Sequence, residues 1–205
     1  MTIGLKSDTL GGATLLFYCM DIFTVPFYHY SIPNWSDVKQ KILKEYNNAD
    51  MDLIDSKLER NHFLYTDYYK NFGSMPKYII NTLEIITPQI EKFCDDINIV
   101  IKGQKIKHGK VSAAWFEKLE KDMNHPVHNH GSIGFSSVCY VEFDPSIHLS
   151  TIFLSPFSSF LTGQLMHHQP EVKEGDIVFF PSFLLHYAPT NTTDKSRLIF
   201  SFNMR

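Results

Sequence analysis

The chain of 205 residues has an ordinary globular composition, with 43% hydrophobic and 20% charged residues, which excludes a disordered or low-complexity protein. Its net charge of −3 gives no global basic field, so we expect no nucleic acid among its partners. Three scattered cysteines, none in a Cys-x-x-Cys spacing, exclude a disulfide framework and fit a reducing cytoplasm. No run approaches the roughly 20 apolar residues of a membrane helix, so we also expect no membrane partner.

Two amphipathic helices are predicted in the N-terminal half. The first starts with Ser36 as its N-cap, carries apolar residues at helical spacing and ends at Asn47. The second starts at Pro76, a good first-turn residue, and continues to Ile97 with an interruption at Pro88. We expect both to support the rest of the fold from outside.

From Ile99 onward, short runs rich in Val, Ile, Phe and Tyr alternate with Gly, Pro, Asn and Asp, as in antiparallel sheets. The predicted strands cover residues 98–102, 105–119, 127–130, 135–143, 149–155, 164–168, 177–180 and 196–203. Eight short strands predict a mainly β (α+β) fold, a barrel or jelly roll with the helices packed outside. Because no repeat, linker or composition break divides the chain, we expect one domain over residues 1–205, with a helical scaffold at about 1–97 and a β-barrel core at about 98–205.

Histidines are the unusual feature of the predicted barrel. His125, His128 and His130 fall within six residues. Side chains at positions i and i+2 of a strand project to one face, so His128 and His130 can both point into a barrel while Asn129 points away. His125 has the opposite parity and precedes Pro126, so we expect it at the mouth or outside. The adjacent pair His167–His168 splits between two faces, which predicts surface or rim positions.

A third candidate ligand lies near the C-terminus. The segment before His186 predicts a turn at Gly175, a buried strand and a break at Pro181. Eleven residues after His186, Arg197 opens an apolar terminal strand, where its charge is costly to bury unless it meets an anion. That anion could be the carboxylate of a bound acid.

Together, two histidines at i and i+2, a third 56 residues after the second, and the arginine suit an open metal site with an acid-binding arm. Imidazole binds iron, zinc, copper and nickel, so the ligands alone do not choose the metal. The alternative is that these histidines are rim or core residues bonded to the backbone, which is the commoner role of any one histidine. Their order together with Arg197 favours the metal site.

These residues resemble those of iron(II)- and 2-oxoglutarate-dependent oxygenases with a double-stranded β-helix (jelly-roll or cupin-like) core. The nearest group is prolyl-hydroxylase-like and common in marine bacteria and their phages. The resemblance begins at Asp21–Tyr28, which is similar to that group's N-terminal Phe-x-Thr-Pro strand, and strengthens at Trp115. It strengthens further at His128–His130 and Ser136–Tyr140, and its most specific stretch is Gly175–His186, ending with Arg197–Asn203.

The resemblance implies that His128, His130 and His186 bind Fe(II), and that Arg197 pairs with the distal carboxylate of 2-oxoglutarate, the cosubstrate used together with O2. Tyr140 is the candidate for a second hydrogen bond to that acid, its alternative role being a packed core tyrosine. The wider superfamily usually has His-x-Asp or His-x-Glu where this sequence has His128-x-His130. Three neutral imidazoles leave the full dication, which a dianionic cosubstrate could compensate.

The resemblance therefore implies a cytoplasmic dioxygenase, in the host cytoplasm if a phage encodes it. It would couple 2-oxoglutarate decarboxylation to hydroxylation of an unactivated C–H bond in a small molecule, an amino acid or a peptide, with prolyl groups among the candidates. Two alternatives stay open. One is a three-histidine dioxygenase that does not use 2-oxoglutarate, against which Arg197 argues. The other is a non-catalytic barrel that binds metal or 2-oxoglutarate without turnover.

Overall fold

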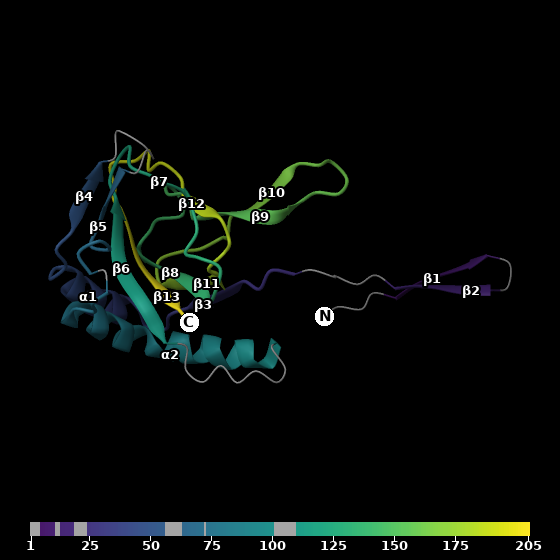
Figure 1. Cartoon of the computed structure of the whole chain (residues 1–205), viewed down its shortest axis with the longest axis horizontal. Helices are drawn as coiled ribbons and strands as arrows, with labels where there is room; N and C mark the ends of the chain where they lie inside the picture. Colours follow the sequence, from purple (N-terminus) through teal and green to yellow (C-terminus); the bar gives the residue numbers. More distant parts are fainter. Residues whose placement is uncertain (1–4, 11–12, 19–23, 56–62, 72, 101–109) are drawn as a thin grey trace.

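The computed structural model describes residues 5–10, 13–18, 24–55, 63–71, 73–100 and 110–205. Two helices and thirteen strands lie within these residues (Figure 1). In chain order they are β1 (Leu5–Leu10), β2 (Ala13–Tyr18), β3 (Tyr28–Ser31), α1 (Trp35–Tyr46), β4 (Asp52–Asp55), β5 (Phe63–Thr66), α2 (Lys77–Val100), β6 (Val111–Leu119), β7 (His125–His128), β8 (Phe135–Glu142), β9 (Ile152–Ser158), β10 (Leu165–His168), β11 (Asp176–Pro181), β12 (His186–Ala188) and β13 (Arg197–Met204).

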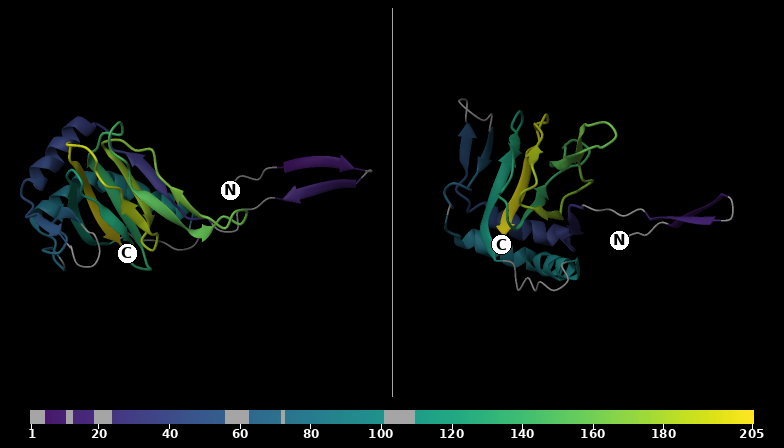
Figure 2. Two further views of the ribbon diagram at one scale, coloured as in Figure 1. Left: turned by 90° about the horizontal axis from the view of Figure 1, so that it is seen from above. Right: turned by 45° about the vertical axis from the view of Figure 1, so that its right-hand side comes forward.

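The strands from β6 to β13 form two facing antiparallel sheets. The larger sheet has the order β3-β11-β8-β13-β6-β5-β4, and the smaller has the order β10-β9-β12-β7. From β6 onward the chain alternates between the two sheets, except that β9 and β10 form a hairpin within the smaller one. Thus β6, β8, β11 and β13 lie in the larger sheet, and β7, β9, β10 and β12 lie in the smaller. This confirms the expected mainly β fold, a double-stranded β-helix with supporting helices. Figure 2 shows the two helices on one side of the larger sheet.

The larger sheet is buried on both faces, as β11 illustrates. Ile177 and Phe179 pack in the core between the sheet and the helices, whereas Val178 and Phe180 pack in the core between the two sheets. Because successive strand residues point to opposite faces, a strand covered on both sides needs an unbroken apolar run. The sequence from Ile177 to Phe180 is such a run.

The helices differ from expectation in two details. Asn34, with φ 52°, rather than Ser36, occupies the N-cap of α1. The predicted interruption at Pro88 is wrong, since α2 is continuous from Lys77 to Val100. Proline costs an interior helical hydrogen bond. The apolar face of α2 offsets that cost, because Ile86 and Phe93 on either side of Pro88 are both buried against the sheet.

The strand boundaries also need correction. The strand predicted at 98–102 is wrong over 98–100, which belong to α2, while residues 101–109 lie outside the described ones. The region expected to be a helical scaffold contributes β3, β4 and β5 to the larger sheet. The three-residue strand β12 was missed as well. Neither α1 nor α2 is long and apolar enough to cross a membrane.

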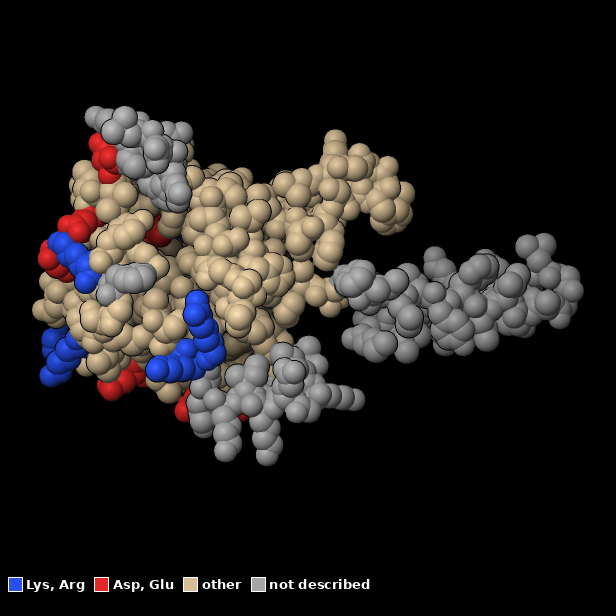
Figure 3. All heavy atoms as spheres, in the orientation of Figure 1, with Lys and Arg blue, Asp and Glu red and all other residues tan. Residues whose placement is uncertain are grey.

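The β9–β10 hairpin projects from the body of the molecule (Figure 1). Residues 152–168, which span this hairpin, contain no Asp, Glu, Lys or Arg. In Figure 3 the hairpin accordingly carries no blue or red spheres. His167 and His168 are both exposed on β10, in agreement with their expected surface positions.

Candidate metal centre

Three histidine side chains meet between β7 and β12. His128 ends β7, His130 follows two residues later, and His186 opens β12 directly opposite His128. The ligand nitrogens of the three lie within 4.8 Å of one another, and the two Nε2 atoms of His130 and His186 are 3.3 Å apart. Two imidazole nitrogens at about 2.1 Å from one ion would be separated by roughly 3.0–3.4 Å in octahedral or tetrahedral geometry. The cluster therefore has the dimensions of a metal site.

Backbone hydrogen bonds set the tautomers of two of these rings. Nδ1 of His128 lies 2.8 Å from the carbonyl oxygen of Pro126, and Nδ1 of His186 lies 2.8 Å from that of Leu184. A carbonyl only accepts, so each Nδ1 carries the hydrogen and each Nε2 carries the lone pair. Such outer hydrogen bonds orient imidazoles that bind metals.

Burial keeps two of the histidines uncharged. It lowers the pKa of His130 to about 3, with the positive charges of His128 and His125 acting in the same direction. Burial likewise holds the pKa of His186 well below its ordinary value. Metal ions bind neutral imidazole, so these rings are in the binding form at ordinary pH without first losing a proton.

The expectation that His125 lies at the mouth or outside is wrong. Its ring stacks on that of His128, with centroids 3.9 Å apart and an interplanar angle of 11°. The cause is a β-bulge, because β7 uses three steps from His125 to His128 where β12 uses two from Ala188 to His186. The extra residue on β7 shifts the in-and-out alternation by one position. The side chains of His125 and His128 therefore point to the same face, although they are an odd number of positions apart. His125 thus lies beside the histidine cluster.

Glu117 is the site residue that the sequence analysis missed. Its side chain is buried, and its Oε2 lies 2.8 Å from Nδ1 of His125. Burial by itself would raise the pKa of Glu117, but the charges of His125, Arg197 and His128 lower it to about 2. The missed signal is strand parity, since Glu117 follows Trp115 by two residues on β6 and so shares its inward face.

Arg197 is buried at the start of β13, with 2% of its surface exposed. Its Nη2 donates to the Thr151 hydroxyl at 2.9 Å, but its buried Nε and Nη1 have no hydrogen-bond partner among the described residues. Tyr140 adjoins this group, its ring centre 5.6 Å from the guanidinium carbon and its hydroxyl accepting from the Thr151 N–H at 3.3 Å. Unpaired buried N–H groups are costly, and a carboxylate is the partner that would satisfy them.

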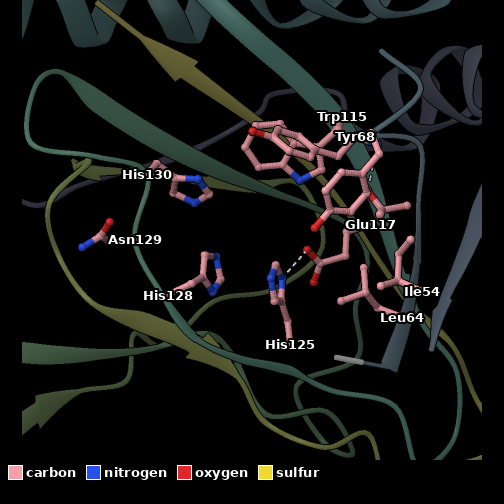
Figure 4. Close-up of a pocket in the computed structure, with 11 residues that line it drawn as sticks. Ile54, Leu64, Tyr68, Trp115, Glu117, His125, His128, Asn129 and His130 are labelled. Atoms are coloured by element: carbon pink, nitrogen blue, oxygen red, sulfur yellow. Dashed lines mark hydrogen bonds and ion pairs between the residues drawn. The ribbon is translucent and has the colours of Figure 1, made fainter. Parts of the chain in front are cut away.

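Two spaces adjoin the histidines. A cavity of about 300 Å³ opens between β5, β6 and the histidines (Figure 4). A second, smaller space of about 20 Å³ lies among the three histidines, Thr151 and Ser201. Trp115 and Glu117 line both spaces. Asn129, which the parity argument expects to point away, also lines the larger cavity (Figure 4).

Residues 113–203 match the sequence family described as "Putative 2OG-Fe(II) oxygenase". A search of curated proteins found no match. Among solved structures, a Pseudomonas putida prolyl-4-hydroxylase has a TM-score of 0.59 at 13% identity, covering 89% of this chain and 93% of that protein. A 2OG-Fe(II) oxygenase family oxidoreductase from Burkholderia pseudomallei has a TM-score of 0.60 at 11% identity, covering 86% and 84%.

HygX from Streptomyces hygroscopicus, solved with nickel and 2-oxoglutarate, has a TM-score of 0.55 at 12% identity, covering 88% of this chain and 83% of HygX. At these identities the structural neighbours show the fold, while the sequence match covers residues 113–203, less than half of the chain. Both agree with what the sequence motifs imply. The 2OG-Fe(II) oxygenases are therefore the family that this chain resembles, in sequence over residues 113–203 and in fold over most of its length.

Proposed function

We propose that this protein is an iron(II)- and 2-oxoglutarate-dependent dioxygenase whose metal is held by His128, His130 and His186. The observation that carries the proposal is the convergence of these three side chains, with Nδ1 of two of them tied to backbone carbonyls. A bound iron ion would supply a template for the cosubstrate and O2. The rings themselves need little rearrangement, because burial and backbone contacts already orient them.

Arg197 is the proposed partner of the cosubstrate, with Tyr140 as the second donor. The two unpaired guanidinium atoms of Arg197 fit the requirement for an anion. Because the Tyr140 hydroxyl accepts from the Thr151 N–H, its own hydrogen is available to donate. The smaller space, of about 20 Å³, cannot hold a five-carbon diacid, so we propose that its walls move when the acid binds.

We propose hydroxylation of a C–H bond in a small molecule or an amino-acid residue as the reaction. Among the structural neighbours, one prolyl hydroxylase was solved with a peptide fragment of hypoxia inducible factor, and HygX was solved with hygromycin B. The cavity of about 300 Å³ beside the histidines has the size of a small-ligand pocket. Its Trp115 and Tyr68 rings would exclude water from the substrate.

The test combines metal binding with turnover. Anaerobic calorimetric titration of iron(II) into the metal-free protein should show one site per chain, and 2-oxoglutarate should then yield succinate in air. The matched control for His130→Ala is His167→Ala, which changes an exposed histidine on β10. Binding of metal and 2-oxoglutarate without succinate would identify a non-catalytic barrel, and turnover that needs no 2-oxoglutarate would identify the three-histidine alternative.

A further inference from the structure

The cavity between β5, β6 and the histidines has an aromatic wall. Tyr68 packs edge-on against Trp115 with ring centroids 5.0 Å apart, and against Tyr69 at 5.2 Å. Tyr69 is 60% exposed and lies at the entrance, while Trp115 is buried deep in the wall. Aromatic faces are electron-rich and attract cations, most strongly where water is excluded.

Glu117 supplies the acidic group of this cavity. Among the described residues that line the cavity, Glu117 is the one carboxylate and none is a lysine or an arginine. Among the described residues, only Oε2 of Glu117 has a hydrogen-bond partner, His125, and Oε1 has none. A neutral His125 can donate that hydrogen bond, which leaves the negative charge of the carboxylate in place. Figure 4 shows Glu117 between Tyr68 and His125.

The position of the carboxylate fits a substrate subsite. Glu117 lines both the larger cavity and the smaller space, and both are also lined by His128 and His130. Arg197, which we assign to the cosubstrate, does not line the larger cavity. A group bound beside Glu117 in the larger cavity would therefore lie next to the proposed metal ligands.

From these observations we propose that the substrate carries an ammonium or guanidinium group, held by Glu117 against the rings of Tyr68, Tyr69 and Trp115. This inference rests on the proposed function, since it assigns the substrate class of that same site. A buried carboxylate with one open oxygen rejects anions by repulsion. It also leaves its charge unpaired when the ligand is neutral, so it selects for a cation.

The experiment measures binding of small probes by ligand-observed NMR titration and needs no turnover. Butylammonium and butylguanidinium are the cationic probes, 1-butanol is the neutral one and butyrate the anionic one. Each is titrated into the full chain, once metal-free and once with nickel and 2-oxoglutarate. We expect the cations to bind about ten-fold more tightly than 1-butanol, the ratio that corresponds to one modest charge interaction, and butyrate to bind most weakly.

Two pairs of variants locate the effect. Glu117→Gln should remove the preference for cations, while Glu120→Gln should keep it, because Glu120 is paired with Lys118 and does not line the cavity. Tyr69→Leu should weaken cation binding by about two- to five-fold, while Tyr65→Leu should not, since Tyr65 lies between two lining residues of β5 and points to the other face.

The results can overturn the inference without touching the proposed function. Equal binding of butylammonium and 1-butanol to the wild type, or an unchanged preference in folded Glu117→Gln, would refute the cation site even if succinate forms. Conversely, a cation preference that depends on Glu117 would support the site even in a chain that releases no succinate.

Discussion

His125 and His128 stack face to face with ring centroids 3.9 Å apart. They lie three positions apart on one strand, a spacing at which side chains ordinarily point to opposite faces. The bulge in β7 permits this contact, and Glu117 holds the outer ring in place through Nδ1 of His125. A buried carboxylate is thereby linked through two stacked rings to a proposed metal ligand. The link differs from the usual carboxylate partner of a metal-bound histidine, because the acid contacts the neighbour of the ligand rather than the ligand.

We first predict that His125→Ala destabilises the fold by about 1–3 kcal/mol, the cost of leaving the buried Glu117 carboxylate without its hydrogen-bond donor. Urea denaturation measures the change in the free energy of unfolding. In the Glu117→Gln background the same substitution should cost less, and the double-mutant cycle gives the coupling energy between the two side chains. A coupling energy near zero would show that the hydrogen bond at 2.8 Å contributes nothing to stability.

Second, His130→Ala should lose most of the metal affinity, whereas His130→Asp should keep the metal. Aspartate at this position would give the two-histidine, one-carboxylate set that suits iron(II). Calorimetric titration above about pH 7, where free imidazole is mostly neutral, compares the two variants. Unchanged metal affinity in folded His130→Ala would mean that residue 130 is not a ligand.

Third, Arg197→Ala should weaken 2-oxoglutarate binding by about 2–4 kcal/mol, as expected for truncating one side of a buried charged pair. Arg197→Met removes the same charge while filling more of the volume, so a loss shared by both variants does not reflect a cavity. Lys195→Ala is the control, because Lys195 is exposed near the same end of β13. Unchanged affinity in folded Arg197→Met would place the acid elsewhere.

Fourth, Gly175→Ala should be more destabilising than Gly163→Ala. Both glycines have positive φ, +82° and +69°, so both substitutions cost about 1–2 kcal/mol of backbone strain. A Cβ at Gly175 would also lie 2.6 Å from Cδ2 of Trp35, whereas a Cβ at Gly163 would meet nothing within 4 Å. The difference in thermal stability between the two variants measures the contribution of packing between α1 and the turn at Gly175. Equal effects would show that Trp35 moves aside freely.

Fifth, Asp67 should make stability decrease as pH rises. It is fully buried, and burial raises its pKa despite hydrogen bonds from the Tyr78 hydroxyl and the Phe116 N–H. The folded state then keeps the proton to higher pH than the unfolded state, whose pKa is about 3.9. Ionisation therefore costs stability progressively above that value and up through the raised pKa. Relative to Asp67→Asn, the wild type should lose free energy of unfolding as the pH rises above about 4 in urea titrations.

Periodicity predicted the β-helix well, because strands covered on both faces produce unbroken apolar runs such as Ile177–Phe180. The strands β3, β4 and β5 were not recognised, since four residues are too few for an alternating pattern to stand out. Their pairing is also non-local: β3 pairs with β11 and β5 with β6, far along the chain. The prediction of a helix interruption at Pro88 was wrong for a related reason. The helix propensity of the local sequence does not include the packing of α2 on the sheet.

The candidate site was predicted in part. Spacing alone pointed to His128, His130 and His186, which the structure brings together. It also pointed to Arg197 at the head of a buried strand. Position 125 could not be placed correctly, because a bulge leaves no mark in the sequence and reverses the parity on which the argument depended. Once His125 was assigned outside the barrel, nothing drew attention to its partner Glu117.

The alternation of side chains along β13 has a practical consequence for protein engineering. Leu198, Phe200 and Phe202 face the helices, whereas Ile199 and Ser201 line the smaller space beside the histidines. Mutant libraries confined to the first set can therefore seek higher thermal stability without altering the chemistry. Libraries confined to the second set can seek new selectivity while leaving the helix-packed core intact, so the two properties can be evolved in separate rounds.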